Sequence, residues 1–68
     1  NAFYVAGGSI VALRFDRTRV LVARIDPARG ARVIGALSDV VAASCLVRLP
    51  SLWCRRTDNM LGVWRLPA

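Results

Sequence analysis

The fold is decided by residues 9–25, which read SIVALRFDRTRVLVARI. Apolar residues alternate with their neighbours in both halves of this stretch, at Val11, Leu13 and Phe15 and again at Leu21, Ala23 and Ile25. A period of two residues is typical of a β-strand. The polar segment 16–19 between the halves suits a tight turn, so residues 9–25 predict an antiparallel β-hairpin.

The flanking segments extend this hairpin into a β-rich chain. Residues 3–6 are a candidate strand that ends at a pair of glycines, and residues 26–30 (DPARG) are a clear break because proline fixes φ and glycine permits a positive φ. Residues 52–56 and 61–66 are strand candidates on either side of a polar turn. The chain therefore predicts an all-β fold of antiparallel hairpins.

The middle of the chain leaves two alternatives open. Ser38 and Asp39 suit the start of a helix that would end at Pro50, which predicts an α+β fold with one helix near 38–49. The β-branched residues 40 and 41 instead suit a buried strand over 39–44, and short apolar runs do not distinguish the two. We prefer the strand because the hairpins on both sides repeat.

The two hairpins correspond at a spacing of about 40 residues. Residues 9–14 (SIVALR) align with residues 51–56 (SLWCRR), which lie 42 positions further along the chain. Residues 22–25 (VARI) align with residues 63–66 (VWRL), which lie 41 positions further along. A period of roughly 40–45 residues built from short strands is typical of the blades of β-propellers.

This repeat resembles the quinoprotein-type, WD-like β-propeller repeats, in which a strand is followed by a polar turn and a strand that ends in tryptophan. The second copy supplies LWC at 52–54, the turn TDNM at 57–60 and Val63-Trp64, and about 1.7 degenerate repeats span the chain. Arg19 and Met60 replace the turn glycine, and Ala23 replaces the first tryptophan. The resemblance implies a propeller-blade-like architecture, with a small barrel as the other all-β arrangement, and it implies no cofactor.

A second resemblance concerns residues 25–34 (IDPARGARVI), which are similar to the core motif of swapped-hairpin transcription regulators and antitoxins. Ala31 interrupts the Gly-Arg pair of that motif, and Gly35 stands where its proline belongs. This similarity implies a DNA-binding dimer and adds to the nucleic-acid alternative below.

The composition argues against an enzyme. The chain contains no lysine, glutamate, glutamine or histidine, so the usual general acid–base residues are missing apart from four aspartates. These aspartates are scattered, and Asp16, Asp26 and Asp58 fall in turn-like segments. We therefore expect no catalytic residue, no metal site, no cofactor and no small-molecule substrate.

The charge is strongly positive, with ten arginines against four aspartates and a net charge of +6. A GC-rich coding sequence would account for arginine in place of lysine, but it does not explain the shortage of acids. Arg17, Arg19, Arg55 and Arg56 fall at or beside two predicted turns and are candidate polyanion-binding residues, because guanidinium groups fit phosphate oxygens. Contact with RNA or DNA is thus one expectation, and a solvated rim of charges is the other.

The apolar content of 56% exceeds what one small core can hide, so we expect a partner. Trp53, Trp64 and Tyr4 are the candidate interface anchors. The leading hypothesis is a non-catalytic binding or structural module that contacts other protein chains or copies of itself through an apolar β surface. Residues 1–68 would form a single small module, either a fragment of a larger domain or one protomer of an assembly.

Cys45 and Cys54 are too few for a disulfide framework or a four-ligand zinc site. The sequence favours two buried free thiols, because it carries no secretory signal, and one Cys45–Cys54 bridge is the alternative. The longest apolar stretch, 33–49, is interrupted by Asp39 and Arg48 and is too short for a membrane span. Without a signal peptide or a span, a cytoplasmic location is favoured.

Overall fold

A computed structural model describes residues 2–67 of the chain, apart from the side chain of Ala6. Its regular elements are β1 (Ala2–Ala6), β2 (Ser9–Asp16), β3 (Arg19–Asp26), β4 (Gly30–Leu37), β5 (Leu46–Arg48), β6 (Ser51–Arg55) and β7 (Leu61–Arg65). The all-β expectation is confirmed, and the α+β alternative is wrong, since no helix occurs in the described range. Residues 1 and 68 of the expected module lie outside it.

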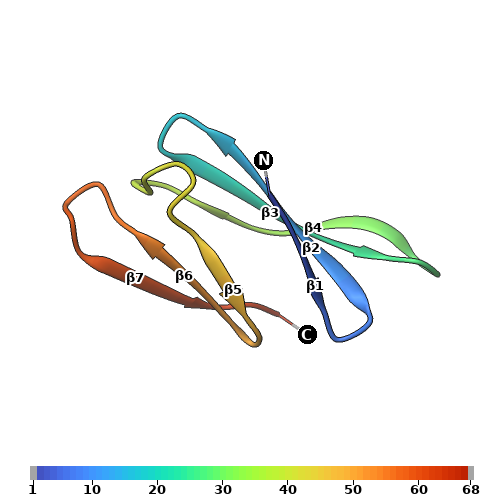
Figure 1. Ribbon diagram of the computed structural model, residues 1–68. Helices are drawn as coiled ribbons and strands as arrows, with labels where there is room; N and C mark the ends of the chain where they lie inside the picture. Colours follow the sequence, from blue (N-terminus) through green and yellow to red (C-terminus); the bar gives the residue numbers. More distant parts are fainter. Residues whose placement is uncertain (1, 68) are drawn as a thin grey trace.

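The strands form two antiparallel sheets, each with its strands in chain order. The first sheet is β1-β2-β3-β4 and the second sheet is β5-β6-β7. They lie side by side in Figure 1, with the first sheet in blue to green and the second sheet in yellow to red. The described strands do not close into a small barrel, so that alternative is wrong.

Local sequence explains the hairpin turns of the first sheet. Gly7 and Gly8 both have positive φ between the paired residues Ala6 and Ser9, which is the backbone that two-residue hairpin loops require. The β3–β4 loop has Pro27 after Asp26 and ends at Gly30, whose φ is +80°. Asp26 Oδ1 accepts a hydrogen bond of 2.8 Å from the backbone amide of Ala28, which fixes the start of this turn.

The sequence predicted neither strand β4 nor strand β5, and for β4 the structure shows the reason. Pairing with β3 places Val33 opposite Ala23 and Gly35 opposite Val22, so Ile34 is the extra residue of a β-bulge. A bulge reverses the alternation of side chains between the two faces, and the regular period of two is lost across this strand. The sequence pattern therefore shows no continuous strand where the structure has eight residues of one.

Residues 38–45 are a connection between the sheets, so the expected strand over 39–44 is wrong apart from an isolated bridge between Val40 and Arg56. Asp39 and Ala43 have positive φ, which interrupts both a strand and a helix. The Val40 amide donates to the Thr18 carbonyl at 2.9 Å. This connection therefore links the β2–β3 turn to the end of β6.

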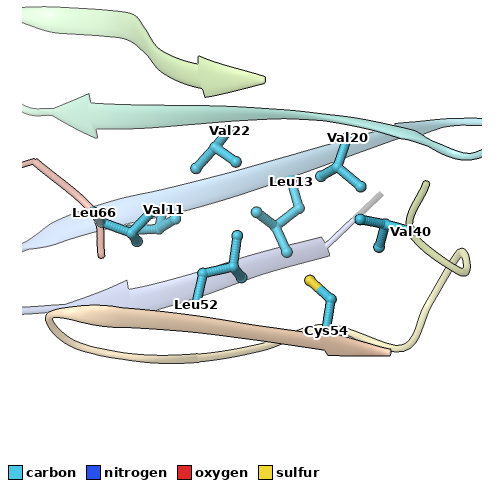
Figure 2. Packing of buried hydrophobic residues seen from close by; sticks show 8 residues of the cluster. All are labelled: Val11, Leu13, Val20, Val22, Val40, Leu52, Cys54 and Leu66. Atoms are coloured by element: carbon cyan, nitrogen blue, oxygen red, sulfur yellow. The ribbon is translucent and has the colours of Figure 1, made fainter. Parts of the chain in front are cut away.

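The core lies between the two sheets (Figure 2). Its members come from β2, β3, the connection, β6 and the segment after β7, and they are Val11, Leu13, Val20, Val22, Val40, Leu52, Cys54 and Leu66. We call the side of each sheet that faces this core its inner face and the opposite side its outer face. Eight core residues are few for a chain with so much apolar content, so apolar side chains must remain outside the core.

Candidate functional site

Part of the outer face of the first sheet is apolar across all four strands. Cross-strand pairing brings Phe3, Ala12, Ala23 and Val33 into one row, and a second row runs through Val5, Ile10, Ile25 and Ala31. Val5 is 87% exposed, and Phe3 and Val33 are also exposed. Large contiguous apolar patches on small proteins mark interaction surfaces.

Small residues leave this outer face hollowed near one end. A hollow of about 300 Å³ is lined by Val5, Gly8, Ser9, Ile10, Ile25 and Pro27. The centre of the face has only alanine at positions 12 and 23. A large side chain from a partner would fit against this surface better than a small one would.

The outer face of the second sheet has an apolar centre and a charged border. Leu46, Trp53 and Val63 lie directly opposite one another on the three strands, and Leu61 is exposed beside them. Trp53 is 40% exposed. Further along the same face, Arg48 of β5 and Arg65 of β7 both pair with Ser51 of the central strand β6. This face therefore presents a projecting apolar group between cations.

Residues that correspond in the sequence repeat have opposite burial. Val11 is 0% exposed, whereas its counterpart Trp53 lies on an outer face. Conversely Ile10 is 37% exposed, whereas its counterpart Leu52 is 0% exposed. In the other hairpin strand the aligned residues differ in register, because Val22 pairs with Leu13 whereas Val63 pairs with Trp53, the counterpart of Val11.

The alignment of β2 with β6 bears on how the two sheets meet. If like faces met across a two-fold axis, corresponding residues would have the same burial on both sheets. Instead, the inner face of the second sheet corresponds to the outer face of the first. Under the proposed repeat, the contact between the sheets would be heterologous, or head-to-tail, with one free face of each type.

The three aromatic candidates lie in different environments. Trp53 is exposed on the outer face of the second sheet, while Trp64 is half-buried against the core. The Tyr4 hydroxyl donates a hydrogen bond of 2.8 Å to the Cys45 carbonyl, which links the first sheet to the start of the second. Of these three aromatic residues, Trp53 is the one with an exposed side chain on an outer face.

The four arginine candidates lie at one end of the molecule. Arg17 lies in the β2–β3 turn and Arg19 is the first residue of β3. The Thr18 carbonyl of the same turn accepts a hydrogen bond from the Val40 amide, and Val40 forms an isolated β-bridge with Arg56. Arg56 is paired with Asp58 at 2.9 Å, and Arg55 donates to Asn59 at 3.2 Å. Local partners thus already engage the second pair of arginines.

A further group of arginines lies at the β3–β4 hairpin and was not among the candidates from the sequence. Arg24 and Arg32 are opposite one another across the two strands, and Arg29 lies in the loop between them. The Arg24 Nε is buried without a hydrogen-bond partner. An unsatisfied buried donor of this kind costs about 1–3 kcal/mol. Only the strand register could reveal this group, because its members are spread over nine positions.

Cys45 and Cys54 are joined in a disulfide, contrary to the expectation of free thiols. The reason is the register of β5 and β6, because Leu46 pairs with Trp53 and the next positions outward are the two cysteines. Residues on adjacent antiparallel strands are close enough for this bond when they are directly opposite. The bond ties the connection to β6.

The described residues include no group of three or more potential metal ligands among histidine, cysteine, aspartate and glutamate. They also include no helix of the length and apolar character needed to cross a membrane. No protein-family model, curated protein or solved structure matches the chain.

Proposed function

We propose that this protein is a non-catalytic binding module that associates with further copies of itself through its two outer faces. In this proposal the outer face of the first sheet binds the outer face of the second sheet of another copy. The observation on which it rests is the exchange of burial between corresponding residues of the repeat, Val11 with Trp53 and Ile10 with Leu52.

The contact within the chain supplies the pattern for the contact between chains. Leu52 and Cys54 of the second sheet cover Val11 and Leu13 of the first sheet in the core. Ile10 and Ala12 of the first sheet correspond to Leu52 and Cys54, and they lie on its outer face. An added copy would place corresponding residues of β2 and β6 in a similar head-to-tail contact.

Size complementarity also supports this pairing. The outer face of the first sheet is built on alanines with a hollow at one end, whereas the outer face of the second sheet projects Trp53 between Leu46 and Val63. Small residues opposite a large one allow close packing, and aromatic residues are enriched at the centres of interfaces. Like-to-like contact would instead oppose Trp53 with Trp53.

The sheet order supports a propeller-like interpretation of such a stack. Blades of a propeller are four-stranded sheets with strands in sequence order, each covered on both faces by its neighbours. The order β1-β2-β3-β4 and the repeat of 41–42 residues fit this description. Head-to-tail contacts form a ring when the rotation between units closes, and an open stack when it does not.

A second candidate function is binding to RNA or DNA through the arginines at the end of the molecule formed by the β2–β3 turn and the end of β6. The observation that favours this function is that Val40 contacts both segments, by a hydrogen bond to the Thr18 carbonyl in the turn and by a β-bridge to Arg56. The ion pair between Arg56 and Asp58 weighs against it. Binding to phosphates would weaken linearly in log affinity with log salt, whereas apolar self-association would not.

The test is the mass of the chain measured by analytical ultracentrifugation over a range of concentrations. The wild-type mass is expected to rise with concentration, and Val33→Arg or Trp53→Arg is expected to lower it because each places a charge on one outer face. Thr18→Arg adds the same charge in an exposed turn and is the matched control, which should associate like the wild type. A folded wild-type chain that stays monomeric, or equal effects of all three changes, would contradict the proposal.

A further inference from the structure

The β3–β4 hairpin forms a pocket of about 170 Å³ that is lined by Arg24, Asp26, Arg29, Gly30 and Arg32. Strand pairing places Arg24 directly opposite Arg32, and the turn that begins at Asp26 places Arg29 at the end of the same pocket. The site is therefore formed by a rigid hairpin, with one arginine from each strand and one from the loop.

The positive charges of this pocket are only partly compensated within the described residues, by the carboxylate of Asp26. Like charges directly opposite one another on adjacent strands destabilise a sheet. No ion pair between residues 2 and 67 joins Arg24, Arg29 or Arg32 to a carboxylate. Asp26 accepts the hydrogen bond from the Ala28 amide and so contributes to the turn. The Arg24 Nε is buried and has no acceptor.

We propose that this pocket is a binding site for a doubly charged phosphate group, either inorganic phosphate or a phosphate monoester. Three guanidinium groups and one carboxylate give the lining a charge of +2, which matches a phosphate dianion. Guanidinium forks donate paired hydrogen bonds to phosphate oxygens, and an anion bound between Arg24 and Arg32 would offset the repulsion between their charges.

This site is independent of the self-association proposed above. The pocket does not include Trp53, Leu46 or Val63 of the second sheet or Phe3 and Val33 of the first sheet. It is also distinct from the turn that contains Arg17 and Arg19, which lies at the opposite end of β3. The two proposals can therefore fail separately.

The test is titration of the isotope-labelled chain with inorganic phosphate, and in a second arm with glycerol phosphate, at constant ionic strength. The amide and arginine Nε resonances would be followed by NMR. We expect saturable shifts at Arg24, Arg29 and Arg32, and the tighter of the two ligands identifies the source of the phosphate group. Arg24→Gln should weaken binding roughly tenfold or more, because it removes a charge-assisted hydrogen bond.

The exposed Arg32→Gln keeps the test valid if the half-buried Arg24 cannot be replaced without loss of structure, and it should weaken binding to a similar degree. Arg19→Gln removes the same charge at the far end of β3 and is the matched control, with an unchanged dissociation constant expected. Shifts that do not saturate with either ligand, or an equal loss in Arg19→Gln, would overturn the proposal and indicate general attraction of anions to a basic chain.

Discussion

Replacement of Leu52 by alanine, compared with replacement of its repeat counterpart Ile10, measures how differently the two sheets use corresponding positions. Both changes remove three carbon atoms from a β-branched or γ-branched aliphatic side chain. At about 0.8 kcal/mol for each buried carbon, full burial of three carbons stabilises the fold by roughly 2.4 kcal/mol. Leu52 is 0% exposed, so this transfer contribution is lost completely when it is replaced.

The remaining cost for Leu52 is the cavity between the sheets. Leu→Ala changes in closed cores lower the free energy of unfolding by about 2–5 kcal/mol, and the packing of Leu52 against β2 and β3 places it in the upper half of that range. Ile10 is 37% exposed. Its loss should therefore cost at most about 1.5 kcal/mol, since part of the side chain already contacts water and an open surface leaves no cavity.

The assay is urea unfolding followed by tryptophan fluorescence, at a chain concentration low enough for the wild type to be monomeric. We expect Leu52→Ala to lower the free energy of unfolding by at least twice as much as Ile10→Ala. The same Ile10→Ala variant should weaken self-association at higher concentration. Equal losses of unfolding free energy at the two positions would refute the conclusion that corresponding residues have exchanged faces.

Two further predictions concern the second sheet. The Cys45–Cys54 bond joins residues at a sequence separation of 9, and its reduction should lower the free energy of unfolding by roughly 2–3 kcal/mol. In thermal unfolding, the double variant Cys45→Ala/Cys54→Ala should not respond to reductant. A wild type that is insensitive to reductant would contradict this prediction. A Cβ atom at Gly62 would overlap the Trp64 ring, so Gly62→Ala should displace the indole and lower the free energy of unfolding by about 1–3 kcal/mol. Gly35→Ala is the control, because a Cβ atom there meets no neighbour. Near-UV circular dichroism reports on the ring, and an unchanged spectrum in both variants would contradict the placement of Trp64.

The sequence was sufficient for the hairpins but not for the assignment of faces. Alternation predicted β2 and β3, whose apolar positions are regular, and the polar turn between residues 52–56 and 61–66 predicted β6 and β7. Alternation grouped Leu21 with Ala23 and Ile25 on a common face, and the structure places that group on the outer face. When both faces of a sheet are apolar, the period of two identifies the strand but contains no information about which face is buried.

The elements that sequence analysis missed depend on tertiary contacts or on backbone irregularity. The bulge at Ile34 concealed β4, and positive φ at Asp39 and Ala43 made the connection neither helix nor strand. The choice between free thiols and the Cys45–Cys54 bond, and the placement of Arg24 opposite Arg32, depend on strand register, which no local pattern specifies. The repeat rests on the sequence alone, and the head-to-tail relationship of the sheets is a proposal that combines it with the burial of β2 and β6.

The most direct test of that relationship as a mode of self-association is a complementation experiment with two variants. Val33→Arg blocks the outer face of the first sheet and leaves the outer face of the second sheet intact, and Trp53→Arg does the reverse. Head-to-tail association predicts that each variant alone is monomeric in the ultracentrifuge, and that an equimolar mixture gives the mass of two chains and nothing larger. If either variant forms dimers by itself, or if the mixture remains monomeric at concentrations where the wild type associates, the head-to-tail account is contradicted.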